Sequence, residues 1–456
     1  MASKTTLNAR NLEALGAARL AALLIEVSTG NAAAKRRIRL ALAGADSPLA
    51  VAHEVRKRLI AIGASKGRVS WRRRKALVED LDTQRRAIAG PLAATDPAEA
   101  MDLIWRFLAL AGPVLARSTD TSGAVTAVFQ AASADLPAIA RAARADPLAL
   151  ADRAATALAA NDQGQYDGLA AALVPLLGAS TGDGSPGLDR LRQRLSRLPG
   201  PAPRQALQAI ADCLGDVDGF IGQIDPAARA LPTIAARIAQ RLLAAGRVAE
   251  AAASLHAVRP DHRPRLSHSR TDLDWEDAQI AVLEAQGRGS AAQALRLACF
   301  EQALSAPHLK AYLKRLPDFD DIEARDLALD LATRHPAATL ALHVLVSWPD
   351  LERAAALVMQ RGAALDTDRH DLLGPAAQAL AGRYPLAATL IWRAMIDDTL
   401  TRRRAGRYRM AARWLDECRG VAGTIGDVGA AVSHDDYLEQ LRRDHARKAA
   451  FWRHLS

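Results

Sequence analysis

Leucine, isoleucine and alanine recur every three or four residues over long stretches of this sequence, and a glycine follows many of these stretches. One such stretch runs through Ile234, Ile238 and Leu242 and ends at Gly246. This spacing places the apolar side chains on one side of a helix, and the glycine supplies the left-handed turn at which a helix ends. Roughly a hundred alanines strengthen the pattern, because alanine has the highest helix propensity. We therefore predict an all-α chain.

A helix-turn-helix pattern occurs twice in the second half of the chain. Residues 242–247 (LLAAGR) match residues 283–288 (LEAQGR) in their leucine, alanine, glycine and arginine positions. A hairpin of two antiparallel helices buries its apolar face only when it stacks on neighbouring hairpins. The pattern predicts a helical-repeat, tetratricopeptide-like α-solenoid, with Gly246 and Gly287 each at a helix C-terminus.

The chain of 456 residues is longer than one compact core usually requires, so we expect several parts. Asp96 and Asp146 precede apolar stretches and are predicted to cap helices, Asp146 with a proline behind it. The predicted parts are a basic helical subdomain at 1–177, a flexible Gly/Pro-rich connection with a short helix at 178–203, a helical-repeat subdomain at 204–433, and a C-terminal capping helix at 434–456.

The net charge of +10 is unevenly distributed along the chain. Residues 1–90 carry +11, residues 402–456 carry +5, and the remainder carries −6. Basic ends can attract phosphates or an acidic partner. Alternatively, the arginines are solubilising residues that are compatible with helices.

The cysteines and the apolar stretches indicate a compartment. Cys213, Cys299 and Cys418 are far apart and form no CxxC pair, which favours reduced thiols over a disulfide framework. The longest apolar stretches each contain a proline and are too short to cross a bilayer, so we expect no membrane insertion. We predict a cytoplasmic protein.

Segments spread over most of the chain resemble an uncharacterised bacterial all-helical family, a domain of unknown function. The residues that carry the resemblance are 214–218 (LGDVD), 239–249 (AQRLLAAGRVA), 274–278 (DWEDA), 314–321 (KRLPDFDD), 348–349 (WP), 385–390 (PLAATL), 407–412 (RYRMAA), and a final group of His434, Tyr437, His445, Arg447, Lys448, Phe451 and Trp452. Related helical regions follow the zinc finger of bacterial SWIM-type proteins, but the Cys-x-Cys and Cys-x-His pairs of that finger are absent here. The resemblance implies a helical-repeat architecture and brings no activity with it.

Several acidic and histidine clusters have both a functional and a structural interpretation. Asp318, Asp320 and Asp321 are suited to a divalent cation, or they cap the helix that starts near Ile322 and complement its dipole. We favour the structural interpretation, and we favour a turn role for Asp216 and Asp218. His256, His262 and His268 lack the spacing of a helical zinc site. We therefore expect no metal and no cofactor, and we assign no catalytic residue.

The two basic ends contain the candidate interaction residues. In the final helix aromatic residues and histidines recur at helical spacing beside arginines, a pattern typical of phosphate or acidic-peptide recognition. Alternatively, that helix caps the solenoid and its aromatics face the core. The candidate contacts at this end are Arg403, Arg404, Arg407, Tyr408, His434, His445, Arg447 and Lys448. The candidate phosphate contacts at the N-terminal end are Arg72, Arg73, Arg74 and Lys75.

These patterns favour a non-enzymatic scaffold that binds another protein or a peptide, because stacked hairpins offer a groove and no catalytic motif accompanies them. The alternative is a nucleic-acid-binding accessory protein that uses the basic ends. An enzyme whose site assembles from distant residues is the third hypothesis.

Overall fold

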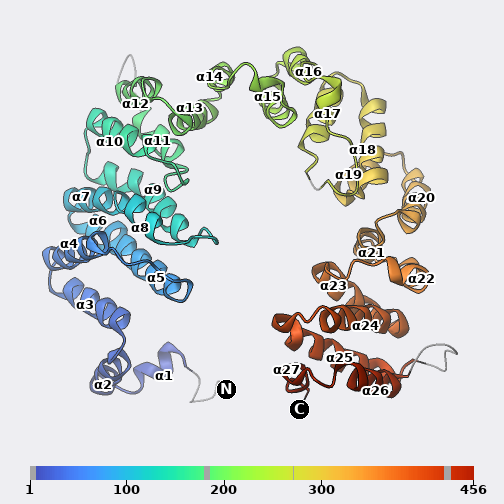
Figure 1. The fold of residues 1–456 in the computed structure, drawn as a ribbon. Coiled ribbons are helices and arrows are strands. Elements are labelled where there is room, and N and C mark those ends of the chain that lie inside the picture. Colours follow the sequence, from blue (N-terminus) through green and yellow to red (C-terminus); the bar gives the residue numbers. More distant parts are fainter. Residues whose placement is uncertain (1–6, 179–184, 271, 426–432, 456) are drawn as a thin grey trace. The chain divides into compact units, whose positions relative to one another are not determined.

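The computed structural model describes residues 7–178, 185–270, 272–425 and 433–455 (Figure 1). Helix accounts for 76% of the structure. In these ranges the extended pairing is limited to an isolated bridge between Val69 and Ser118. The prediction of an all-α chain is confirmed. Residues 179–184, in the predicted connection at 178–203, lie outside the described part of the chain.

Contacts divide the chain into two compact units, Met1–Pro226 (unit 1) and Ala227–Ser456 (unit 2). The helices of unit 1 are α1 (Ala9–Glu13), α2 (Ala17–Ser28), α3 (Ala32–Asp46), α4 (Pro48–Ala64), α5 (Trp71–Ala87), the π-helical η1 (Ile88–Leu92), α6 (Ala93–Thr95), α7 (Pro97–Leu108), α8 (Ala111–Arg117), α9 (Ala124–Ala142), α10 (Pro147–Ala159), α11 (Leu169–Leu177), α12 (Pro186–Ser196), α13 (Pro201–Leu214) and α14 (Val217–Gly222). The helices of unit 2 are η2 (Ala228–Ala230), α15 (Pro232–Ala244), α16 (Val248–His256), η3 (Pro260–His262), α17 (Asp274–Ala285), α18 (Gly289–Ala303), α19 (Ala306–Leu313), α20 (Asp320–Arg334), α21 (Ala338–Ser347), α22 (Leu351–Arg361), η4 (Gly362–Ala364), α23 (His370–Ala381), α24 (Pro385–Thr401), η5 (Ala405–Arg407), α25 (Tyr408–Ala422), α26 (His434–His445) and α27 (Ala449–Trp452).

In both units the helices pack mainly on helices that are close to them in sequence. In unit 1, α4 packs on α5 and α7, α7 on α9, α9 on α11, and α11 on α13. In unit 2, α15 packs on α16 and α17, α21 on α22 and α23, and α24 on α23 and α25. Figure 1 shows this succession within each unit. Each unit is therefore built mainly from contacts between amphipathic helices that are near one another in sequence.

Aspartates begin several helices as the sequence predicts. The carboxylates of Asp96 and Asp146 accept from the backbone N–H of Glu99 at 3.0 Å and of Ala149 at 2.8 Å. Asp216 caps α14 in the same way, which confirms its turn role. The cap predicted for Asp318, Asp320 and Asp321 is wrong, because α20 begins at Asp320 and no side chain bonds its first amides. Asp320 and Asp321 lie in its first turn, where negative charge complements the helix dipole.

The predicted glycine turns are present in unit 2. Gly246 and Gly287 follow α15 and α17 with φ of +75° and +73°, which confirms both positions. The N–H groups of Gly246 and Arg247 donate to the carbonyls of Leu243 and Leu242 at 2.9 and 2.8 Å. This pair of bonds is a Schellman motif, and the turn after α17 repeats it. The sequence repeat therefore encodes a repeated backbone turn.

The same turn occurs where the sequence has no glycine. Arg403 follows α24 with φ of +54°, and the N–H groups of Arg403 and Arg404 donate to the carbonyls of Leu400 and Thr399. Arg144, with φ of +50°, makes the equivalent turn after α9. A side chain in the left-handed region costs backbone energy, so these two turns depend on their surroundings more than the glycine turns do.

The C-terminal end of unit 2 consists of two helices instead of one. The capping helix predicted at 434–456 breaks after His445, and the indole Nε1 of Trp452 donates to the carbonyl of His445 at 3.0 Å. The break turns Phe451 into the core, where its ring meets Tyr408 edge to face. Tyr437 and Leu441 of α26 are buried in the same core cluster as α24 and α25. The aromatics of this end therefore pack inward.

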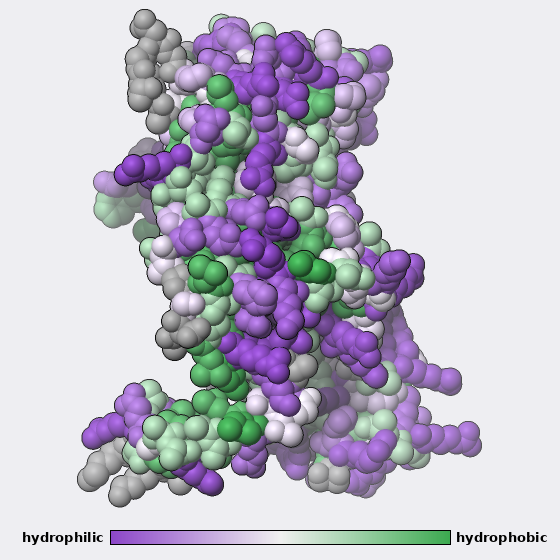
Figure 2. All heavy atoms as spheres, turned by 90° about the vertical axis from the view of Figure 1, so that its left-hand side faces the viewer, coloured by the Kyte–Doolittle hydropathy of each residue, from purple (hydrophilic) through white to green (hydrophobic). Residues whose placement is uncertain are grey.

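Apolar side chains remain exposed near the start of unit 1. Leu24, Ile25 and Val27 of α2 are more than half exposed, and the only buried residue of that helix is Ser28. On the face drawn in Figure 2, apolar surface interrupts the hydrophilic side chains, most visibly at the lower end. By contrast, α7 and α9 bury Phe107 and Phe129 against each other, with ring centroids 5.2 Å apart.

Candidate functional site

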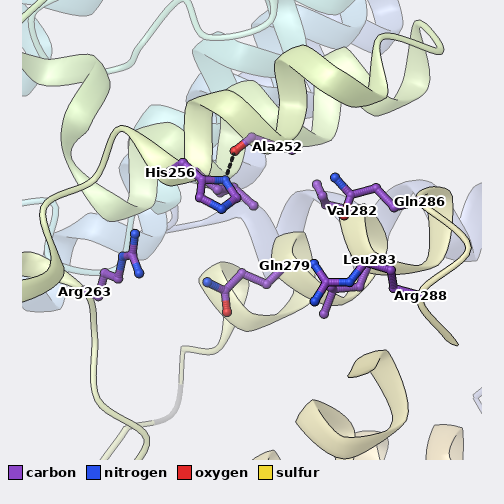
Figure 3. A pocket seen from close by; sticks show the side chains of 9 residues that line it. Ala252, His256, Arg263, Gln279, Val282, Leu283, Gln286 and Arg288 are labelled. Atoms are coloured by element: carbon purple, nitrogen blue, oxygen red, sulfur yellow. Dashed lines mark hydrogen bonds between the residues drawn. The ribbon is translucent and has the colours of Figure 1, made fainter. Parts of the chain in front are cut away.

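A cavity of about 190 Å³ lies between α16 and α17 of unit 2 (Figure 3). The buried side chains of Leu255 and Val282 contribute to an apolar lining. The other lining residues are Ala252, His256, Arg263, Gln279, Leu283, Gln286 and Arg288. The cavity thus combines an apolar surface with two arginines, a histidine and two amides, a combination typical of ligand sites.

The two arginines of this cavity have no described carboxylate partner. Arg263 donates from Nε to the backbone carbonyl of Val258 at 3.3 Å, and Arg288 has no side-chain polar contact in the described structure. The nearest carboxylate in sequence, Glu284, accepts instead from Arg296 at 2.5 Å and from Arg315 at 3.1 Å. The cavity therefore presents positive charge that the chain itself leaves uncompensated.

His256 adds a polar atom to the same cavity. Its Nδ1 lies 2.7 Å from the carbonyl oxygen of Ala252, the contact drawn in Figure 3. A carbonyl oxygen only accepts, so Nδ1 carries the hydrogen of this bond. Nε2 has no described partner.

A comparison of equivalent turn positions identifies Arg288 as unusual. Arg247, Arg288 and Arg404 each follow the left-handed residue of a Schellman turn. Arg247 pairs with Glu250 at 2.7 Å, and Arg404 pairs with Asp368. The residue three positions after Arg288 is an alanine, so the local partner of Arg247 has no counterpart there. Among these three positions, the unpaired arginine is the one that lines a cavity.

A larger cavity, of about 750 Å³, lies between α3 and α5 of unit 1, but its charges compensate one another. Its buried carboxylate, Asp80, pairs with Arg36 at 3.5 Å and with Arg58. A second carboxylate, Asp82, accepts from Arg86 at 2.8 Å. This cavity therefore offers less uncompensated charge to a ligand than the one in Figure 3.

The arginines predicted as contacts at the C-terminal end surround an aspartate of the same chain. Arg404 donates hydrogen bonds from both Nη atoms to the two carboxylate oxygens of Asp368. The Nη1 of Arg402 lies 3.0 Å from Asp368 Oδ2, and the Nη1 of Arg407 lies 3.5 Å from Asp368 Oδ1. The hydrogen bonds from Arg404, with the charges of all three arginines, hold the pKa of Asp368 well below its usual range. Arg404 and Arg407 are therefore engaged within the chain.

Arg403, His445, Arg447 and Lys448 have no described carboxylate partner. The Nζ of Lys448 lies 2.6 Å from Nδ1 of His445. Burial and the neighbouring Arg403 lower the pKa of Lys448, and burial and Lys448 lower the pKa of His445. The structure thus brings three of these four predicted residues close together and leaves Arg447 exposed on its own.

The aromatic residues of this end form an internal polar network. The hydroxyl of Tyr437 donates to Asp397 Oδ1 at 2.7 Å, and the guanidinium of Arg393 lies 4.4 Å from the centre of the Tyr437 ring. Burial raises the pKa of Tyr437 and of Asp397. The predicted contact Tyr408 is 6% exposed, and the predicted contact His434 is half-buried with its Nδ1 enclosed. These side chains therefore contribute to the packing at the end of unit 2, and they offer little exposed surface for a partner.

The predicted N-terminal contacts lie in the first turn of α5 and have different surroundings. Arg72, Arg73 and Lys75 are exposed, and Arg74 donates to the hydroxyls of Thr121 and Ser122 at 3.3 Å each. Lys75 has a distant carboxylate neighbour, Glu79, at 4.0 Å. The two basic ends therefore differ in how far their charges are paired.

A serine, a histidine and an aspartate approach one another in unit 2. Ser305 Oγ lies 2.7 Å from Nδ1 of His308, and His308 Nε2 lies 3.1 Å from Asp277 Oδ1. Hydrolases use these three residue types, but they need a substrate cavity at the hydroxyl. Ser305 is the N-cap residue of α19 and does not line either of the two cavities described above. We interpret the group as a link between α17 and the start of α19.

Other reactive side chains are also placed by the structure. Within the described ranges, no group of three or more His, Cys, Asp or Glu side chains is arranged to hold a metal ion. Burial raises the pKa of the Cys299 and Cys418 thiols to about 12, which disfavours the reactive thiolate. Across the same ranges, no helix has the length and apolar character needed to cross a membrane.

A protein-family model covers nearly the whole sequence, matching residues 2–199 and 185–454. The chain belongs to the family of unknown function DUF6880. No curated protein matches the chain. Membership in DUF6880 agrees with the resemblance noted in the sequence, and it assigns no activity to the cavity between α16 and α17.

Sequence reasoning missed the residues of this cavity. It treated His256 only as a candidate metal ligand and Arg288 only as part of a repeat. The available signal was a difference between the two repeat copies. The residue three positions after Arg247 is Glu250, but the residue three positions after Arg288 is an alanine. Arg263 lies in an irregular segment, and no spacing rule connects it with α17.

Proposed function

We propose that this chain is a non-enzymatic helical-repeat scaffold whose cavity between α16 and α17 binds a segment of another protein. The segment carries a carboxylate beside an apolar side chain. The observation that carries the proposal is the unpaired Arg288, which lines the apolar cavity together with Arg263. A carboxylate would bond these guanidiniums, and an aliphatic or aromatic side chain would cover Leu255 and Val282.

The proposed architecture is a tetratricopeptide-like solenoid of antiparallel hairpins. Its support is the packing of each helix on near neighbours in sequence and the Schellman turn that recurs after α15, α17 and α24. In this proposal α26 and α27 cap the array, which is consistent with the buried Tyr437 and Phe451. The three cysteines are free, with Cys299 and Cys418 buried and Cys213 exposed, which is consistent with the proposed cytoplasmic location.

Fluorescence polarisation with labelled peptides tests the proposal. The probes are 12-residue peptides in which one glutamate follows a leucine or phenylalanine, each paired with a glutamine version. A hydrogen bond to a charged group contributes about 1.5–3 kcal/mol, so Arg288→Ala should weaken binding of the glutamate peptide about tenfold or more. The matched control is Arg247→Ala, which removes an arginine from the equivalent turn and should change the affinity less than about twofold.

Two results would contradict this function. Equal affinity for the glutamate and glutamine peptides would show that the arginines do not select a carboxylate. Equal losses in Arg288→Ala and Arg247→Ala would show that net charge, and not the cavity, determines binding.

Nucleic-acid binding through the basic ends is the second candidate function. The observations favour it at the N-terminal end only, because Arg404 and Arg407 at the C-terminal end already pair with Asp368. The proposed relation to helical regions of SWIM zinc-finger proteins rests on sequence resemblance alone.

A further inference from the structure

Two loops of unit 1 are joined by the isolated bridge between Val69 and Ser118. The N–H of Val69 donates to the carbonyl of Arg117 at 2.9 Å. The bridge brings the segment before α5 beside the segment between α8 and α9, although these segments are separated in sequence. Side chains also join the two segments, since Arg117 donates to Ser65 and Arg74 donates to Thr121 and Ser122. The two segments therefore form one local surface.

This surface is strongly cationic. Residues 65–75 and 117–123 together contain seven lysines and arginines and a single acidic residue, Asp120. The carboxylate of Asp120 accepts from the N–H and the hydroxyl of Thr126, at 2.9 and 3.0 Å. We call Lys66, Arg68, Arg73, Arg74, Lys75 and Arg117 the N-terminal basic surface.

Two arginines of the N-terminal basic surface donate hydrogen bonds to neutral groups. Arg117 donates to Ser65 Oγ at 3.2 Å and to the carbonyl of Ile62 at 3.1 Å. Arg74 donates to hydroxyls, and Arg68 and Arg73 are exposed with no described side-chain partner. The charge of Arg74 lowers the pKa of the neighbouring Asp120, and Lys75 lies 4.0 Å from Glu79. Arg68, Arg73 and Arg117 have no described carboxylate partner.

The location of these charges disfavours a purely solubilising role. Arg72, Arg73 and Arg74 stand in the first turn of α5, where there is no acidic residue and no side-chain cap. Cations at a helix N-terminus oppose the helix dipole, so solubility alone would favour placing them elsewhere on the helix. An anionic partner would offset this repulsion.

We propose that the N-terminal basic surface binds the phosphate backbone of a nucleic acid. Guanidinium, ammonium and hydroxyl groups are the donors that contact phosphate oxygens in such complexes, and a phosphate chain supplies several anions to cations spread over two loops. Thr121 and Ser122 add hydroxyls beside Arg74. This inference deepens the second candidate function and is independent of the peptide cavity, which lies in the other unit.

The test measures binding of the full chain to a fluorescein-labelled 20-nucleotide single strand and to a 20-base-pair duplex of mixed sequence. Each phosphate contact contributes about 0.7 to the salt slope for a single strand and about 0.9 for a duplex. Four contacts therefore predict that duplex affinity falls about a hundredfold between 50 and 200 mM NaCl. Affinity should depend little on base sequence.

The informative variant is Arg68→Ala/Arg73→Ala, which removes two exposed side chains that have no described bond. It should lower the salt slope by about two. The matched control, Arg141→Ala/Arg197→Ala, removes the same charge from exposed positions elsewhere in unit 1 and should leave the slope unchanged. Circular dichroism melts of both variants verify that the fold is retained.

Several outcomes would overturn the proposal. An equal loss in the control would mean that net charge alone drives binding. Binding that is insensitive to salt would exclude a phosphate contact. Preferential binding to vesicles containing phosphatidylserine, or to a polyglutamate peptide at the same ionic strength, would assign the surface to a membrane or to an acidic protein instead.

Discussion

The tripeptide Arg-Arg-Arg occurs at residues 72–74 in unit 1 and at residues 402–404 in unit 2. The two copies differ in whether the chain supplies a carboxylate to pair with them. In unit 2 an aspartate from the segment before α23 lies against Arg402 and Arg404. In unit 1 the described hydrogen bonds of Arg74 go to hydroxyls, and Arg73 is exposed without a described partner. A run of arginines therefore indicates a binding surface only after the long-range contacts of the chain are known.

The largest effect should come from the aromatic core beneath the C-terminal arginines. Phe451→Ala removes a fully buried ring that packs on Tyr408, and such a loss typically costs about 3–5 kcal/mol. Truncation after residue 433 should have a similar effect, because it also removes Tyr437. The measurement is urea unfolding with hydrogen exchange over α24 and α25. Met410→Ala, at a side chain that is 41% exposed, is the control.

Unaltered unfolding of the Phe451→Ala protein, together with unaltered exchange in α24 and α25, would contradict a capping role for α26 and α27. The C-terminal arginines would then lie on an independently mobile end, and their pairing with Asp368 would say little about their availability.

The second prediction concerns a variant in which Arg402, Arg404 and Arg407 lose the carboxylate that they share. Asp368→Asn removes the charge shared by Arg402, Arg404 and Arg407, so unit 2 should acquire binding to the labelled duplex. Arg402 still pairs with Asp398 at 2.9 Å, so one or two new phosphate contacts should steepen the salt slope by about one to two. Asp371→Asn, which removes a nearby charge that pairs only with Arg369 among the described contacts, is the control. No gain in slope would mean that the exposed C-terminal cations do not reach a phosphate backbone.

The third prediction concerns the turns that carry these arginines. Gly246→Val should destabilise unit 2 by about 1–2 kcal/mol, because its φ of +75° disfavours a side chain. No atom outside the adjacent residues lies within 4 Å of the added Cβ, so backbone strain is the expected cause. Gly382→Val is the control, since Gly382 also follows a helix but has φ of −72°. Equal thermal melts for the two variants would show that the left-handed turn is not what matters.

The reciprocal change gives the fourth prediction. Arg403→Gly relieves a left-handed arginine, but the added freedom of glycine in the unfolded chain offsets part of the gain. We expect a net stabilisation of about 0.5 kcal/mol in urea unfolding. Arg403→Ala keeps the strained backbone and should give no gain. A destabilised Arg403→Gly protein would show that the Arg403 side chain itself makes a necessary contact.

The smallest effect concerns pH. The pKa of Asp368 is held below its usual value by Arg404, so its contribution to stability is present above the unfolded pKa near 4 and is lost as the pH falls through the folded value. The difference in melting temperature between wild type and Asp368→Asn should therefore stay constant from about pH 8 to pH 5 and shrink below about pH 3. A difference that persists in acid would point to packing instead of charge.

Local features of the fold were predictable from the sequence, and long-range ones were not. Asp96, Asp146, Gly246 and Gly287 act through backbone groups a few residues away, so their positions could be read directly. Arg144 and Arg403 make the same left-handed turn, but arginine has no preference for the left-handed region, so its presence does not predict the turn. The contact between Arg404 and Asp368 spans 36 residues, and no local rule links them.

The candidate cavity also depends on long-range contacts that the sequence did not predict. The repeat located Arg288, but its isolation became visible only when the structure placed Glu284 on Arg296 and Arg315. The break after His445 was also unpredictable, because it depends on the indole of Trp452 reaching a carbonyl seven residues earlier.

In four of the Schellman turns, including one at Gly215 after α13, the residue after the left-handed position has nearly the same backbone conformation. It is Asp216, Arg247, Arg288 or Arg404, with φ between −79° and −89° and ψ between 54° and 81°. Because the turn's hydrogen bonds use only main-chain atoms, the turn itself does not restrict the identity of this side chain. Descendants of one ancestral chain can therefore acquire different partners by single substitutions at these corners, with little need for compensating changes in the core.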